Sequence, residues 1–416
     1  MVLESFFAEH VAGDLLTARV VKLNLFLVSD FCQSNNFVEN DKVKIGRNEK
    51  CWCNSGLKYK KCHLGRDRET PVSKAEALNF SKTNSQRKVC YAPASMHEDC
   101  DKRIVQAHTL SKSSSLKAIA DSDNHVMGVV MNLPSLMRNK GRWVPEKIGI
   151  NQASTFTGFC SVHDRILFSC LENQNFTGTD EQCFALMFRS LSKEIYAKEG
   201  GRRSSDFAKK ADKGKPQADQ LYIQEFVSLH QSGLNAAITE LKNLKTSLDR
   251  IMLSRQFSEI ESVILTFSEP LPIAVSSILS PEKDFDNTEI QDLNDLTVSA
   301  EQVCFNAFSN AGKGYIVFSW LGTSEIIRRF VRSLIKVPAD KIFNTLLYFF
   351  FTKAENTYAS PLWWDNLSDK QRENIGYMIM SGIDFFGIPI SRVDYSIDYN
   401  AAALVDIRSS NSEISS

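Results

Sequence analysis

Apolar residues at helical spacing mark the second half of the chain. Between residues 220 and 253 they recur at every third or fourth position, which predicts one long amphipathic helix. The pattern also predicts two strands and three further helical stretches, over residues 258–268, 312–322, 324–337, 339–358 and 360–382. We therefore expect a helix-rich α+β domain over residues 220–407.

The first half of the chain has shorter elements joined by polar stretches. Residues 1–44 are expected to form a short lead-in that contains a strand or hairpin. The pattern predicts a strand over Lys102–His108 and an amphipathic helix over Phe159–Glu172. Residues 198–219 are rich in Gly, Lys and Ser, which is typical of a linker, and residues 408–416 are expected to be a disordered tail.

Charge and apolar content favour a soluble, cytoplasmic protein. The 49 basic and 49 acidic residues cancel, but between residues 41 and 117 basic residues outnumber acidic ones by about two to one. Any nucleic-acid surface should therefore lie in the N-terminal third. No secretion signal is recognisable, and the most apolar run, residues 342–351, is too short to span a bilayer, so no membrane contact is expected.

The ten cysteines are distributed as metal ligands rather than as a disulfide framework. Six of them fall between residues 51 and 160, close to histidines, which suits metal binding in a reducing compartment. The other four are expected to be small apolar residues, namely Cys32, Cys170, Cys183 and Cys304.

The first metal constellation is a C-x-C-x8-C-H segment within residues 45–66. It places four zinc-preferring ligands, Cys51, Cys53, Cys62 and His63, in a stretch short enough to close on one ion. The surrounding sequence, GRNEKCWCNSGLKYKKCHLG, resembles the SEC-C motif. Trp52 stands where that motif usually has proline, and Asn54 where glycine is common. The resemblance implies a zinc-binding module over residues 45–70 and a recognition surface for a protein partner, but no reaction.

The second metal constellation is formed by cysteines and histidines that lie farther apart. Cys90, Cys100, Cys160 and His163 suit a treble-clef arrangement over residues 88–197, in which a knuckle gives two ligands and a helix start gives two more. His97, between the two cysteines, is a competing ligand. With the first site, we expect about two structural zinc ions per chain.

The segment from Cys90 to Glu172 resembles HNH-type nucleases that carry a structural zinc. The resemblance implies that His108 is the general base, that Asn151 is the family's middle Asn and that Asp164 holds the catalytic Mg²⁺ or Mn²⁺. The sequence departs from the family in a wide cysteine pair, a long insert before Asn151, and an aspartate where a histidine is usual. A zinc-bound treble clef without catalysis is the alternative.

Two functions follow from these patterns. The first is a metal-dependent endonuclease whose contacts to phosphate come from four basic residues, Arg103, Lys112, Lys117 and Arg165. The mixture of a finger, a nuclease-like core and an unfamiliar α-rich domain resembles prokaryotic genome and phage defence proteins. The second is a non-catalytic zinc adaptor that recognises nucleic acid or a protein. The sequence does not distinguish DNA from RNA.

Overall fold

The computed structural model describes residues 45–130, 135, 138–139, 143–382, 392–399 and 402–410. This part of the chain combines helices with two sheets. The expected lead-in over residues 1–44 lies outside the described residues, and so does the end of the expected tail. Residues 404–409, partly in that tail, form a strand. No helix in the described ranges is long and apolar enough to cross a membrane.

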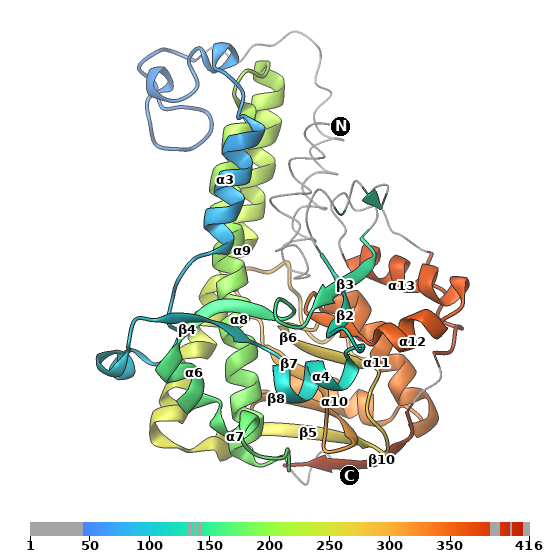
Figure 1. Cartoon of the computed structure of the whole chain (residues 1–416). Helices are drawn as coiled ribbons and strands as arrows, with labels where there is room; N and C mark the ends of the chain where they lie inside the picture. Colours follow the sequence, from blue (N-terminus) through green and yellow to red (C-terminus); the bar gives the residue numbers. More distant parts are fainter. Residues whose placement is uncertain are drawn as a thin grey trace.

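An antiparallel sheet of eight strands forms the centre of the molecule (Figure 1). The order of its strands in space differs from their order in the sequence. From one edge to the other its strands are β10 (Leu404–Ser409), β5 (Ile260–Phe267), β8 (Lys313–Leu321), β7 (Val303–Asn310), β6 (Ile273–Leu279), β9 (Thr357–Ala359), β2 (His125–Val129) and β3 (Pro145–Gly149). The strands predicted over residues 258–268 and 312–322 are β5 and β8. The short strand β9 pairs with both β6 and β2, so the insert after His108 joins the C-terminal sheet.

Helices cover both faces of this sheet, which is why most residues of its central strands are buried. On one face, alternate residues such as Phe305 and Phe318 share an apolar cluster with Phe330 and Leu346. The helices on this side are α10 (Glu325–Ile335), α11 (Ala339–Lys353), α12 (Pro361–Asn366) and α13 (Asp369–Gly382). The opposite face packs against α8, the helix formed by Asp180–Ala208.

A helical stalk projects from the body of the molecule (Figure 1). It consists of the far end of α8, the facing part of α9 (Gln217–Ser254) and α3 (Lys74–Ser85). Phe80 of α3 stacks on Phe207 of α8 with ring centroids 4.2 Å apart. The long helix predicted over residues 220–253 is therefore present, and the polar segment before Cys90 is helical as well.

The expected linker over residues 198–219 is instead the end of α8, a short turn and the start of α9. Its small residues are buried at a close helix contact. A Cβ on Gly200 would lie 2.6 Å from Nη1 of Arg87, and Ser204 accepts a hydrogen bond from Asn84 at 3.0 Å. The small residues that suggested a linker are therefore present because the helices pack closely, and small side chains let the backbones approach each other.

A separate two-stranded sheet lies beside α8. It pairs β1 (Ile104–His108) with β4 (Thr155–Cys160) in antiparallel register, and α6 (Ser161–Leu167) follows β4 directly. The strand ending at His108 and the helix beginning beside Cys160 were both predicted. The helix is shorter than expected because it breaks at Phe168, before α7 (Ser169–Glu172).

The remaining described elements are short helical segments. They are η2 (Tyr59–Lys61), η3 (Arg66–Arg68), η4 (Ala94–Asp99), η5 (Lys112–Leu116), α4 (Lys117–Ile119), η6 (Lys209–Asp212) and η7 (Phe257–Glu259).

Candidate metal centres

Residues 45–70, which we call the finger, cap the far end of the stalk (Figure 1). A β-bridge joins Lys50 to Lys58, and the Cys51 amide donates to the carbonyl of Leu57 at 2.8 Å. The chain therefore turns back sharply between the second and third ligands. Gly56 has a φ of 74° in this turn, a conformation that a Cβ would strain.

Four side chains converge inside the finger, and we call them the finger cluster: Cys51, Cys53, Cys62 and His63. Their ligand atoms all lie within 4.8 Å of one another. Nδ1 of His63 is 3.2 Å from the sulfurs of both Cys51 and Cys62, and the sulfurs of Cys53 and Cys62 are 3.4 Å apart. Tetrahedral zinc, with bonds of about 2.0–2.3 Å, needs ligand atoms at roughly such separations. The donor set and its geometry therefore fit zinc.

The thiols of the finger differ in their acidity. Burial raises the pKa of Cys51 to about 12. Burial also acts to raise the pKa of Cys53, but hydrogen bonds from Ser55 outweigh it and lower that pKa to about 7. Cys53 therefore has the lowest pKa of the three thiols, and zinc would bind with release of thiol protons.

The ligand His63 is held from outside the finger. Its Nε2 lies 2.8 Å from Oδ2 of Asp212, in the turn between α8 and α9, and its ring lies 4.3 Å from that of Trp52. Sequence reasoning missed Asp212, which falls in the expected linker. No local motif indicates it, because the two residues meet only through the fold.

The second set of ligands also converges, and we call it the body cluster: Cys90, Cys100, Cys160 and His163. These ligand atoms too lie within 4.8 Å of one another. Nδ1 of His163 is 3.3 Å from the Cys90 sulfur and 3.2 Å from the Cys160 sulfur. The competing ligand His97 does not take part, because its Nε2 is bonded to the carbonyl of Ala92 at 3.0 Å. These three thiols and one imidazole also fit zinc.

Secondary structure brings the body cluster together. The chain around Cys90 runs beside β4, where the Tyr91 amide donates to Gly158 at 2.9 Å. Cys160 ends β4 and caps α6, whose first turn carries the fully buried His163. Burial raises the pKa of the Cys160 thiol to about 11, while the amide of His163 favours the thiolate. Two described segments far apart in sequence therefore form one site.

The proposed base His108 is at the end of β1, half-buried. Its Nε2 is 3.0 Å from the carbonyl of Ile150, so Nε2 carries the proton and Nδ1 is the free base. Burial lowers the pKa of His108, and the positive charges of Lys112 and Arg189 add to this effect. Asn151 follows Ile150 in the turn after β3 and is exposed.

Asp164 lies near His108, with a group of residues that the sequence did not single out. Burial raises the pKa of Asp164, while the charges of Arg189 and His108 act to lower it. Arg189 of α8 is only 3% exposed and bonds Glu172 at 2.8 Å. Among the described residues, Oδ1 of Asp164, Nε of Arg189 and Oγ1 of Thr109 are buried without a hydrogen-bond partner. Such unpartnered groups are rare in proteins and indicate a ligand or a functional strain.

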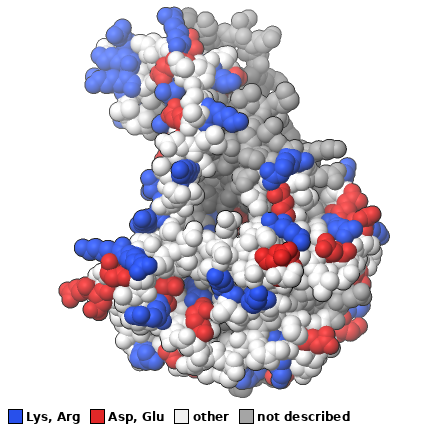
Figure 2. Space-filling model, in the orientation of Figure 1, with Lys and Arg blue, Asp and Glu red and all other residues white. Residues whose placement is uncertain are grey.

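The exposed basic side chains include both predicted and unpredicted residues. The four residues expected to contact phosphate, Arg103, Lys112, Lys117 and Arg165, are all exposed. A second group lies on the finger, where Lys and Arg side chains stand out in Figure 2. Its exposed members are Arg47, Lys50, Lys58, Lys60, Lys61 and Arg68.

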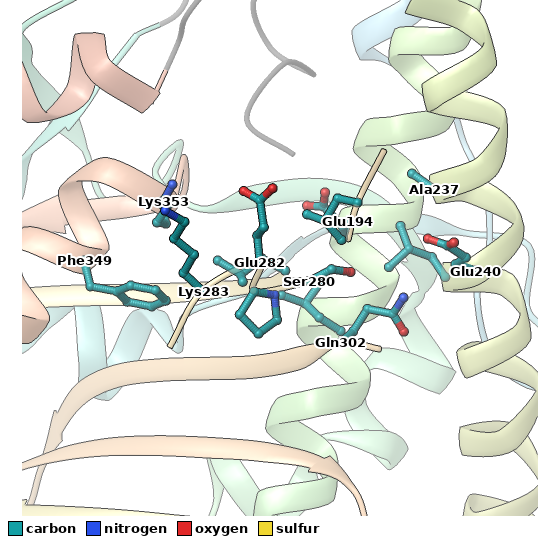
Figure 3. A pocket seen from close by; sticks show the side chains of 14 residues that line it. Glu194, Ala237, Glu240, Ser280, Glu282, Lys283, Gln302, Phe349 and Lys353 are labelled. Carbon is teal, nitrogen blue, oxygen red and sulfur yellow. The ribbon is translucent and has the colours of Figure 1, made fainter. Parts of the chain in front are cut away.

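Two larger hollows lie away from the predicted site residues. A cavity of about 150 Å³ opens between α8, α9 and α11, where Glu194 and Lys353 are among the lining residues (Figure 3). A neighbouring cleft of about 440 Å³ shares both residues. None of the residues predicted to bind metal or catalyse a reaction lines either hollow.

A comparison with protein families identifies a SEC-C motif at residues 47–65. The match contains all four residues of the finger cluster, so the SEC-C expectation is confirmed and zinc binding is supported. No curated protein and no solved structure gave a significant match. The resemblance of residues 90–172 to HNH nucleases stays a prediction.

Proposed function

We propose that the chain is a zinc-containing, metal-dependent nuclease whose reaction centre lies between β1 and α6. One observation carries the proposal: three residues around His108 each have a buried polar atom without a hydrogen-bond partner in the described protein. Asp164 and Arg189 interact electrostatically with His108, and Thr109 follows it in the chain. A strand that ends in a histidine base and a helix that offers a carboxylate are the parts that HNH-like chemistry needs.

The roles of the side chains follow from their charges. His108, held neutral by its lowered pKa, would accept the proton of an attacking water through Nδ1. Asp164 would hold Mg²⁺ or Mn²⁺, an ion that stabilises charge on the leaving oxygen. Arg189 would add a buried positive charge and an unpartnered Nε donor to this site, and Glu172 holds its guanidinium in place at 2.8 Å.

The zinc of the body cluster would be structural in this scheme. Cys160, which caps α6, and His163, in its first turn, would hold the ion and so fix the start of this helix. The position of Asp164 would then be set by the neighbouring ligand His163. The exposed residues Arg103, Lys112, Lys117 and Arg165 would supply a sequence-independent contact with a nucleic-acid backbone, and the charge of Lys112 reaches His108. A role in prokaryotic genome or phage defence is proposed from the resemblance in architecture alone.

The test is a cleavage assay with the purified full-length chain. Labelled double-stranded DNA, single-stranded DNA and RNA are each incubated with Mg²⁺ or Mn²⁺. We expect cleavage of at least one substrate, loss of at least about 100-fold in rate for His108→Ala, and unchanged zinc content. His97→Ala is the matched control, because His97 precedes the same sheet but lies outside both clusters. Wild-type activity in His108→Ala would overturn the assignment.

A non-catalytic adaptor is the second candidate, favoured by the basic finger at the exposed end of the stalk (Figure 2). Its partner would be nucleic acid or an acidic protein, bound by charge. Salt-sensitive binding without turnover in either metal would favour this role over the nuclease.

A further inference from the structure

Asp212 is a buried carboxylate at the turn between α8 and α9. Its side chain is 0% exposed, so its charge must be met by donors within the protein. Three side chains supply them: His63 at 2.8 Å, Arg66 at 2.6 Å and Gln224 at 2.7 Å. Two of these donors come from the finger and one from α9, so Asp212 joins the finger to the stalk.

The bond to His63 also fixes the chemistry of a metal ligand. Nδ1 of His63 faces the sulfurs of Cys51 and Cys62, and Nε2 faces Asp212. With Nδ1 directed toward the ion, Nε2 carries the proton and donates it to the carboxylate. A carboxylate in this position orients the imidazole and increases its basicity as a ligand.

Other contacts around Asp212 show that the finger is seated on the stalk at a close junction. The Gly214 amide donates to the backbone carbonyl of Arg66 at 2.9 Å, and a Cβ on Gly214 would lie 2.8 Å from the carbonyl of Glu69. Lys213 pairs with Glu69 at 3.2 Å. The turn between the helices and the finger therefore depend on each other for their hydrogen bonds.

We propose that Asp212 completes the finger's zinc site from outside the SEC-C motif, so that zinc binding and the ordering of the α8–α9 turn are coupled. Asp212 is a positioning residue: it acts on the metal through His63. With zinc bound, the finger would be held as a cap on the stalk through His63 and Asp212. This inference does not depend on nuclease activity.

Zinc release provides the first test. The release of zinc from the full-length protein is followed over time with a colorimetric chelator. Cys62→Ser lacks finger zinc, so the kinetic phase that is present in the wild type and absent from this variant is assigned to the finger. Asp212→Asn should speed this phase by about 10- to 100-fold, the usual effect of losing such a partner. Asp206→Asn is the control, because Asp206 is an exposed residue of α8 that accepts a hydrogen bond from Gln231 at 2.6 Å and lies outside both clusters. Its finger phase should match that of the wild type.

The variant His63→Cys distinguishes an effect that passes through the His63–Asp212 bond from a general loss of stability at Asp212. Four cysteines are a common structural zinc site, so this variant should keep finger zinc through four thiolates while losing the bond to Asp212. Adding Asp212→Asn to His63→Cys should then leave zinc release unchanged. Equal acceleration by Asp212→Asn in both backgrounds would overturn the proposal, because the effect would not pass through His63.

The coupling can also be measured in the other direction, from the finger to the α8–α9 turn. This experiment keeps Asp212 unchanged, so it can be done even if the Asp212 variants fail to fold. Hydrogen exchange is compared between wild type and Cys62→Ser, which removes finger zinc. The coupling predicts at least about tenfold faster exchange in residues 205–224, far from position 62 in sequence. Equal exchange in that segment would contradict the proposal.

Discussion

The two metal clusters have the same donors but are built in different ways. The finger cluster draws its ligands from one short segment, Cys51 to His63, at the end of the stalk. The body cluster collects ligands from Cys90 to His163, and its support includes the β1–β4 pair and the start of α6. A cluster built from one short segment stabilises only that segment and the residues in contact with it. A composite cluster holds distant segments together, so its loss should affect the whole body.

The largest expected effect is therefore from breaking the body cluster. Cys160→Ser should remove that zinc and lower the melting temperature by on the order of 10 °C, because a structural zinc site contributes several kcal/mol to folding. Cys170→Ser is the control, since Cys170 is half-buried on α7 but outside both clusters. A melting curve for Cys160→Ser that overlays the control would contradict the composite role.

Breaking the finger cluster should have a smaller and more local effect. Cys62→Ser is expected to lower the melting temperature of the body by no more than about 3 °C, because the finger contacts the stalk rather than the sheet. Calorimetry and limited proteolysis measure this, with cleavage expected within residues 45–70. A loss of stability as large as that of Cys160→Ser would show that the finger is not peripheral.

The pH dependence of cleavage should report on the body alone. The pKa of His108 is lowered below its ordinary 6.5 by burial, Lys112 and Arg189, and raised in part by Glu172. The base is thus neutral above its pKa, and kcat/KM should fall about tenfold per pH unit below it. The midpoint of this acid limb should lie under pH 6.5, and Cys62→Ser should not move it. A midpoint above 6.5 would exclude His108 as the base.

The smallest effect is expected from the charge of the finger. Reversing Lys58, Lys60 and Lys61 to Glu should weaken nucleic-acid binding by about tenfold and reduce its salt dependence, because phosphate contacts release counterions. The control reverses three exposed lysines of the body, Lys313, Lys336 and Lys341, for the same change in net charge. Binding measured by fluorescence anisotropy should separate the two variants; equal losses would mean that net charge alone matters.

The sequence predicted those features whose causes are local. The finger ligands were found because their spacing suffices to close on one ion, and the α9 helix because its apolar period is long and regular. The strand ending at His108 and the helix beginning beside Cys160 were also found from local patterns. The four body ligands were then grouped from their chemistry, and the structure brings them together.

Features that depend on tertiary contacts were missed. Asp212 was assigned to a linker, because the small residues that pack α8 against α3 have the composition of a flexible segment. Arg189 and Glu172 carry no motif, and their charges act on His108 only because the fold brings α8 and α7 near it. Likewise, no local signal predicted that β2 and β3 would extend the C-terminal sheet through the three-residue strand β9.

Metal analysis of the purified chain tests the central claim, two zinc sites of different construction, most directly. We predict about two zinc ions per wild-type chain, about one in Cys62→Ser and about one in Cys160→Ser, with none in the double variant. A wild-type value near one, or a single substitution that removes both ions, would contradict the account.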